Sequence, residues 1–214
     1  MPKVLVTGFE PFDGEAVNPA FEAMQALNGK TIKGYEVIGK GLPVVFGESR
    51  ELLKKWLDEV EPDIVISVGL AGGRYAISVE RVAINIDDAR IPDNKGRQPV
   101  DEVINPSGPA AYWSKLPIKA IVKEIREAGI PAEVSQTAGT YVCNHIFYGL
   151  MDYLAQKPGV RGGFIHIPFI PAQVADKLQQ PSLHLDDIIR GLEIAIAATI
   201  TYEKDIVEAG GTVS

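Results

Sequence analysis

The chain has a single cysteine, Cys143, among its 214 residues. A lone cysteine has no intramolecular disulfide partner and cannot belong to a multi-cysteine metal site, so both kinds of framework are excluded. If Cys143 takes part in chemistry, it must do so as a thiolate. The alternative is that Cys143 is simply a small buried hydrophobic residue, because cysteine is among the most frequently buried residue types.

The sequence also lacks an excess of basic residues and any long apolar run. Its 21 Lys and Arg residues against 28 Asp and Glu residues give a net charge of −7, so no basic stripe is available to hold a nucleic acid. No stretch approaches the roughly 18 apolar residues of a membrane span, and a strand-like run begins directly after Met1, so we expect neither a membrane anchor nor a secretory leader. These features favour a cytoplasmic protein.

Short apolar runs alternate with amphipathic segments along the chain, without an internal repeat or a linker. The predicted strands are 3–8, 35–45 with an interruption near Pro43, 63–69, 77–86, 132–135 and 162–168. The predicted helices are 20–27, 48–60, 116–128, 144–154 and 186–209. This alternation predicts one catalytic domain over residues 1–214, an α/β fold built as a three-layer α/β/α sandwich around a mixed, partly parallel central sheet.

A cluster of glycines, Gly69-Leu70-Ala71-Gly72-Gly73, follows the clearest buried strand. It resembles a phosphate-binding loop only loosely, since the Lys-Ser/Thr pair of a P-loop is missing and another strand-like run follows where a dinucleotide fingerprint needs a helix. We therefore expect no nucleotide, no metal and no other cofactor.

Cys143 lies in a strand, turn and helix pattern that extends from Ser135 to Met151. The turn contains Gly139, and Cys143 and Asn144 are the first residues of the expected helix. Unpaired N–H groups and the positive end of the helix dipole favour a thiolate at this position, which predicts a lowered pKa for Cys143.

A nucleophilic cysteine needs a base and a group that orients the base. Of the three histidines, His166 is the best candidate, because strand ends collect at the rim of such sheets and hold their side chains rigidly. His145 lies about 200° around the helix from Cys143 and should point elsewhere, and His184 is expected to be exposed. Glu80 lies in an apolar strand, where it is either a solvent-facing edge charge or the partner of Arg81 or of a distant imidazole.

Several motifs resemble those of the pyrrolidone carboxyl peptidases, also called pyroglutamyl peptidases I. The two signature motifs are matched by GLAG with ISVERVAIN at residues 69–72 and 77–85, and by VSQTAGTYVCN at 134–144. VTGFEPF at 6–12, DARIPDN at 88–94 and HIP at 166–168 are also similar to that family. The resemblance implies a cysteine exopeptidase that removes N-terminal pyroglutamate from peptides through a thioester acyl-enzyme. It assigns Cys143 as nucleophile, His166 as general acid and base, and Glu80 as the carboxylate that orients His166.

The 5-oxoproline ring of this substrate is compact and uncharged, so its pocket needs apolar walls and a few hydrogen bonds directed at the amide. Candidate wall residues are Phe9, Phe12, Ile91, Tyr141 and Val142. Asn18 or the backbone near Leu70 could address the lactam, where the family often has Gln in place of Leu70. The oxyanion would be met by backbone N–H groups at Cys143, with Arg90 as a possible further donor.

The resemblance also implies a homotetramer and a fold similar to that of α/β/α purine nucleoside phosphorylases. Two other functions are open from the residues alone. One is a non-catalytic binding or redox-sensing module in which Cys143 is merely oxidisable, and the other is a nucleoside-handling enzyme of similar fold.

Overall fold

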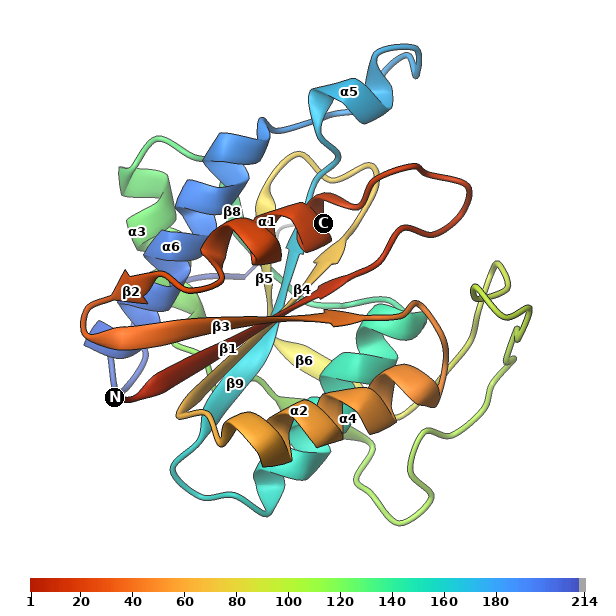
Figure 1. Ribbon diagram of the computed structural model, residues 1–214, viewed down its shortest axis with the longest axis horizontal. Coiled ribbons are helices and arrows are strands. Elements are labelled where there is room, and N and C mark those ends of the chain that lie inside the picture. Colours follow the sequence, from red (N-terminus) through yellow and green to blue (C-terminus); the bar gives the residue numbers. More distant parts are fainter. Residues whose placement is uncertain (212–214) are drawn as a thin grey trace.

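The computed structural model describes residues 1–211, which form a seven-stranded sheet covered by helices on both faces (Figure 1). The sheet strands are β1 (Lys3–Phe9), β2 (Thr31–Ile32), β3 (Tyr35–Leu42), β4 (Ile64–Leu70), β5 (Ile77–Glu80), β8 (Ala132–Ser135) and β9 (Arg161–Ile167), in the order β2-β3-β1-β4-β9-β5-β8. Strands β3, β1, β4 and β9 are mutually parallel, whereas β5 is antiparallel to β9 and parallel to β8. The predicted mixed sheet is confirmed.

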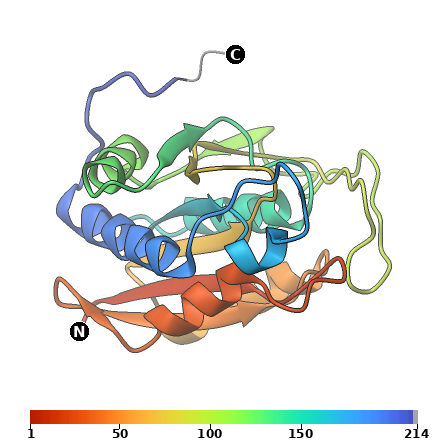
Figure 2. The same ribbon diagram turned by 90° about the horizontal axis from the view of Figure 1, so that it is seen from above.

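Two separate hydrophobic cores lie on the two faces of this sheet. Alternation along β1 sends Val4 and Val6 to one core and Leu5 to the other, as expected for a period of two. The first core is covered by α1 (Pro19–Leu27), α3 (Ile118–Glu127) and α6 (Leu185–Thr201), and the second by α2 (Glu48–Val60) and α4 (Val142–Ala155). These layers form the predicted α/β/α sandwich (Figures 1 and 2).

The predicted strand over residues 77–86 is wrong in one respect, because it is divided between two sheets. β5 ends at Glu80, and β6 (Val82–Ile84) pairs instead with β7 (Ala111–Trp113) in a small antiparallel sheet. Arg81 lies at the crossing, where its N–H donates to the Ser135 carbonyl and its own carbonyl accepts from Ser114. The long segment between β6 and β7, yellow-green in Figure 2, extends along one side of the molecule.

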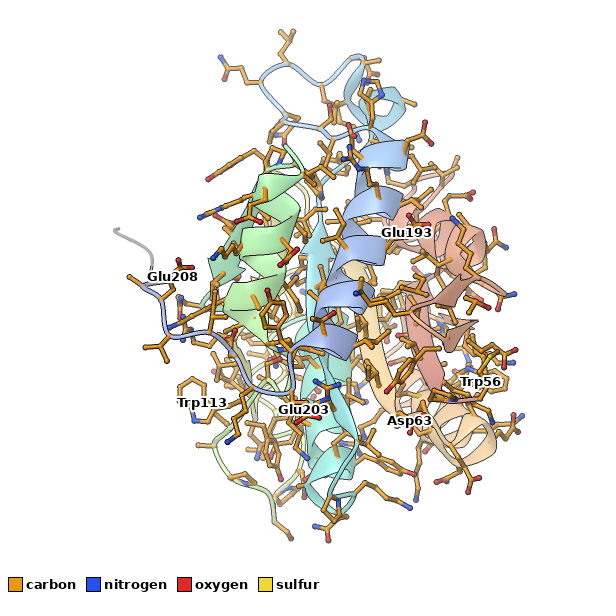
Figure 3. The ribbon with its side chains drawn as sticks, turned by 90° about the vertical axis from the view of Figure 1, so that its left-hand side faces the viewer. Trp56, Asp63, Trp113, Glu193, Glu203 and Glu208 are labelled. Carbon is orange, nitrogen blue, oxygen red and sulfur yellow. The ribbon has the colours of Figure 1, made fainter. Side chains whose placement is uncertain are left out.

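The last helix ends at Thr201 and not near residue 209 as predicted. Beyond it the chain crosses toward α3, where the Asp205 carboxylate accepts hydrogen bonds from the N–H groups of Lys119 and Ala120. Because Pro117 supplies no side-chain cap to α3, Asp205 provides the missing acceptor from a distant part of the chain. Figure 3 shows α3 and α6 side by side, with Glu193 on α6 and Glu208 on the segment that follows it. The short helix α5 (Pro171–Val174) was not predicted.

The predicted place of Cys143 beside the carboxyl ends of β4 and β9 is confirmed, but the directions of the strands change the route by which the chain reaches it. The prediction placed it at the rim formed by the carboxyl ends of the strands, but β8, which precedes it, runs antiparallel to β4 and β9. The site still converges because β5 and β8 have only four residues each, and Val79 pairs with Ile165 two residues before the end of β9. The segment after β8 therefore leads back to the carboxyl ends of β4 and β9, where α4 begins. None of the helices in residues 1–211 is both long and apolar enough to cross a membrane.

Candidate active site

His166 and Glu80 form a buried pair inside the sheet. The Nδ1 atom of His166 lies 2.7 Å from Oε1 of Glu80, and Glu80 is completely inaccessible to solvent. An ionised carboxylate can only accept, so Nδ1–H donates to Glu80 and Nε2 is left for another partner. Of the alternatives for Glu80, the distant imidazole is therefore correct, whereas the solvent-facing edge charge is wrong. Arg81 is not its partner and donates instead to the carbonyl of Gly210.

Cys143 lies directly above β4 at the start of α4. Its Sγ atom would be 2.8 Å from a Cβ built on Gly69, and Gly69 pairs in register with His166 on the neighbouring strand. Only a residue without a side chain at 69 leaves room for the sulfur beside the His166 strand. Tyr141 is the N-cap of α4 and makes no side-chain capping bond, so the first N–H groups of the helix are not capped by it.

The electrostatics of Cys143 differ from the sequence prediction. Burial and, to a smaller extent, the negative charge of Glu80 raise the pKa of Cys143 to about 12, although Arg74 acts in the opposite direction. Desolvation of the thiolate therefore outweighs the helix start, and the predicted lowering of the pKa is wrong for the free protein. Burial also lowers the pKa of His166, although Glu80 partly offsets this effect. The resting pair is consequently a neutral thiol beside a neutral imidazole.

A cavity of about 530 Å³ opens over this pair. Its lining includes every pocket residue predicted from the sequence, together with two of the three proposed catalytic residues. These are Phe9, Phe12, Asn18, Leu70, Arg90, Ile91, Tyr141, Val142, Cys143 and His166. Glu80 lies behind His166 and does not reach the cavity.

The predicted pocket residues differ in how many of their polar groups are already hydrogen-bonded within the protein. Oδ1 of Asn18 accepts from the N–H of Ala20, and its Nδ2 donates to the carbonyl of Glu10. Asn18 therefore caps α1 and holds the preceding loop, with one amide hydrogen left over. The rings of Phe12 and Tyr141 have their centroids 6.3 Å apart, and Arg90 is exposed at the cavity wall.

The other two histidines lie away from the cavity lining, as predicted. Nδ1 of His145 is 2.8 Å from Oδ2 of Asp87, and its Nε2 accepts from the N–H of Gly47. This pair joins α4 to the turn before α2 and to the segment after β6. His184 is exposed just before α6.

Sequence reasoning missed Arg74, which lines the cavity and contacts Glu80. Its Nη1 lies 2.7 Å from Oε1 of Glu80, and its Nη2 lies 2.9 Å from the carbonyl of Thr137. The only available signal was a cation directly after the glycine cluster 69–73, and this pattern does not reveal which strand end the cation faces.

A cysteine beside a histidine that a buried carboxylate holds, in this mostly parallel α/β/α fold, defines the class of cysteine hydrolases. Residues 2–202 match the family described as pyroglutamyl peptidase, peptidase family C15. The chain belongs to this family, and it is accordingly a hydrolase of the cysteine peptidase type.

Individual relatives are similar over almost the whole chain. A pyrrolidone-carboxylate peptidase of Bacillus cytotoxicus is 58% identical over 213 residues, with 99% of both chains covered. Among solved structures, the pyroglutamyl peptidase I of Bacillus amyloliquefaciens is 53% identical with a TM-score of 0.95, covering 97% of this chain and 99% of that one. A mutant pyrrolidone carboxyl peptidase from Pyrococcus furiosus is 46% identical with a TM-score of 0.91, covering 93% and 98%.

Proposed function

We propose that Cys143, His166 and Glu80 carry out the reaction of this family, in which an N-terminal pyroglutamyl residue is removed from a peptide. The observation that carries this assignment is the buried His166 ring, which lines the same cavity as Cys143 while its Nδ1 is held 2.7 Å from Glu80. A fixed Nδ1–H leaves Nε2 as the basic nitrogen, which is the tautomer that a general base for the thiol requires.

The reaction starts from the neutral thiol. As the sulfur of Cys143 attacks the pyroglutamyl carbonyl carbon, its proton passes to Nε2 of His166 and the carbonyl oxygen becomes an oxyanion. Glu80 stabilises the imidazolium that forms, and it keeps its own negative charge. The N–H groups at the start of α4 and the guanidinium of Arg90 are the proposed donors to the oxyanion.

Breakdown of this intermediate completes the cycle. The oxyanion returns its electrons to carbon, the C–N bond breaks, and the leaving amine takes the proton from His166, which leaves a thioester on Cys143. His166 then deprotonates a water molecule that attacks the thioester. Collapse of the second intermediate releases pyroglutamate, and the sulfur recovers its proton from His166.

The shape of the cavity suits a compact uncharged ring. Phe9, Phe12, Ile91, Tyr141 and Val142 are the proposed walls, because apolar side chains exclude water from the lactam. Backbone near Leu70 and the remaining amide hydrogen of Asn18 are the proposed partners of the lactam.

Hydrolysis of a chromogenic pyroglutamyl amide tests the assignment. Cys143→Ala and Glu80→Gln should lower kcat by at least about a hundredfold, since groups of such a triad act as a unit. The wild type should also accumulate an acyl-enzyme whose mass exceeds that of the free protein by one pyroglutamyl group, and Cys143→Ala should not.

His184→Gln is the matched control, because His184 is exposed and outside the cavity lining. Full activity in Cys143→Ala would refute the assignment. A wild type that is inactive on the amide but binds and is stabilised by nucleosides would point to the nucleoside-handling alternative, and an inactive wild type with an oxidisable thiol would point to the redox module.

We further propose a cytoplasmic homotetramer with one catalytic domain over residues 1–214, of which 212–214 lie outside the described residues. The single unpaired cysteine supports the location, and the family resemblance supports the assembly. Light scattering during size exclusion tests the tetramer, and a monomeric mass with full activity would contradict it.

A further inference from the structure

Among the lysine and arginine residues that the structure describes, Arg74 is the one that reaches the buried carboxylate of the site. Oε1 of Glu80 accepts from both His166 Nδ1 and Arg74 Nη1, each at 2.7 Å. No other protein group within residues 1–211 donates to this carboxylate, whose second oxygen is also buried. Two donors on one oxygen therefore fix the orientation of Glu80. One of them, Arg74, neither gives up nor takes up a proton during the proposed reaction.

The second arm of Arg74 reaches the turn that presents the nucleophile. Its Nη2 donates to the carbonyl of Thr137 at 2.9 Å, and that carbonyl also accepts from the hydroxyl of Ser135. Thr137 lies in the segment that leads from β8 to Cys143. The planar guanidinium thus joins the turn after β4, the end of β5 and the turn before α4, which no single-point cation could do with the same geometry.

The charge of Arg74 also matters during the catalytic cycle. His166 alternates between neutral and cationic forms, so for part of each cycle it supplies no positive charge to Glu80. A buried carboxylate without a positively charged partner is strongly disfavoured. Arg74 is only 24% exposed and permanently charged, so it compensates Glu80 in both halves of the cycle.

We propose that Arg74 is a positioning residue, which pairs with Glu80, holds it oriented toward His166 and ties it to the turn that carries Cys143. The role rests on the proposed Cys143, His166 and Glu80 assignment and assigns no contact between Arg74 and the substrate. We expect the loss of Arg74 to lower kcat more than it changes KM, because the orientation of the His166 imidazole matters most when its positive charge develops.

Arg74→Met tests this role, because Met fills similar space without the charge or the fork. We expect kcat to fall about 100-fold while KM changes less than about threefold, as a small misplacement of reacting groups can cost that factor. Arg74→Lys keeps the cation but cannot bond Glu80 and Thr137 together, so kcat should fall about tenfold. Arg190→Met is the matched control, because Arg190 is exposed on α6 and should leave kcat unchanged.

The pH profile separates positioning from a merely structural role. Arg74 lowers the pKa of His166 by charge repulsion, so the acid limb of kcat/KM should move to higher pH in Arg74→Met and stay near the wild-type position in Arg74→Lys. The other ionisable groups here are Glu80 behind His166 and those of the cavity lining, and all are unchanged in both variants: Asp13, Glu15, Asp88, Arg90, Tyr141 and Cys143.

The outcomes also separate this role from the proposed function. Wild-type kcat in either folded variant, or a large rise in KM with kcat unchanged, would overturn the role of Arg74 while leaving the triad intact. Should Arg74→Met fail to fold, as judged by circular dichroism, Arg74→Lys alone decides between a lowered and a wild-type kcat. Full activity in Cys143→Ala, in contrast, would overturn the proposed function itself.

Discussion

Replacing Gly69 by Ala should disturb the proposed nucleophile, Cys143, more than the fold. The φ of Gly69 is not positive, so the backbone suits alanine and only space is at issue. The new Cβ would lie 2.8 Å from both Sγ of Cys143 and the edge of the Phe164 ring. Contacts below 3.4 Å are uncommon for a Cβ, so these neighbours must retreat by about 0.6 Å.

The Phe164 ring is completely buried and in contact with its neighbours, so we expect the sulfur to move more than the ring. Overpacking of this kind typically costs about 1–3 kcal/mol of stability. Displacing the nucleophile toward the cavity should lower kcat by about 10- to 100-fold, because reacting groups misplaced by about 1 Å lose such factors. Urea unfolding and steady-state hydrolysis of a pyroglutamyl amide measure the two effects separately.

Gly149→Ala is the matched control, since its Cβ would approach Arg50 Cδ at 2.6 Å, an even shorter contact. The Arg50 side chain is unbranched and can rotate aside at the cost of its hydrogen bond to the Ile104 carbonyl, which the preference of about 1 kcal/mol for alanine over glycine within a helix offsets. Gly149→Ala should therefore keep wild-type kcat and unchanged or higher stability. Wild-type kcat and stability in Gly69→Ala would show that position 69 does not set the place of the sulfur.

Three further predictions follow from burial in and around the site. Because burial lowers the pKa of His166 below its ordinary 6.5, the acid limb of the kcat/KM profile should lie below pH 6.5, and a limb above that value would contradict the burial argument. Cys143 ionises near 9.0 when unfolded but near 12 when folded, so the unfolded chain loses its proton first and stability should fall by about 1.4 kcal/mol per pH unit above pH 9. Cys143→Ala should remove this contribution in urea unfolding between about pH 9 and 10, below the range in which Tyr112, Tyr141 and Tyr153, whose pKa values burial raises from 10.0 to about 12, add a slope of the same sign. Asn144 is fully buried and bonds the backbone of Ile84 and Ile86, so Asn144→Ala should lower the free energy of unfolding by about 2–4 kcal/mol, and a loss below about 0.5 kcal/mol would show that these bonds contribute little.

The elements with a clear period were predictable from the sequence. The helix over 48–60 and the strand over 132–135 have the predicted bounds, because apolar spacing and flanking turn residues both mark them. The strand over 77–86 and the end of the last helix were not predictable in the same way. Their limits depend on the chain crossing at Arg81 to a second sheet and on Asp205 capping α3, and both involve contacts between distant segments.

For the candidate site as well, some features were predictable from the sequence and others depended on contacts between distant segments. The sequence by itself determined the chemistry, since a single thiol, a histidine near a strand end and a strand-borne carboxylate form a small set of reactive groups within recognisable motifs. Only the tertiary structure decided their surroundings. Antiparallel β5 and β8 stop partway along the sheet, Gly69 makes room for the sulfur, and burial of the thiol overrides the helix start that a local reading of the sequence emphasised. Arg74 belongs to this second group, because desolvation and the pairing of charges depend on neighbours that are far apart along the chain.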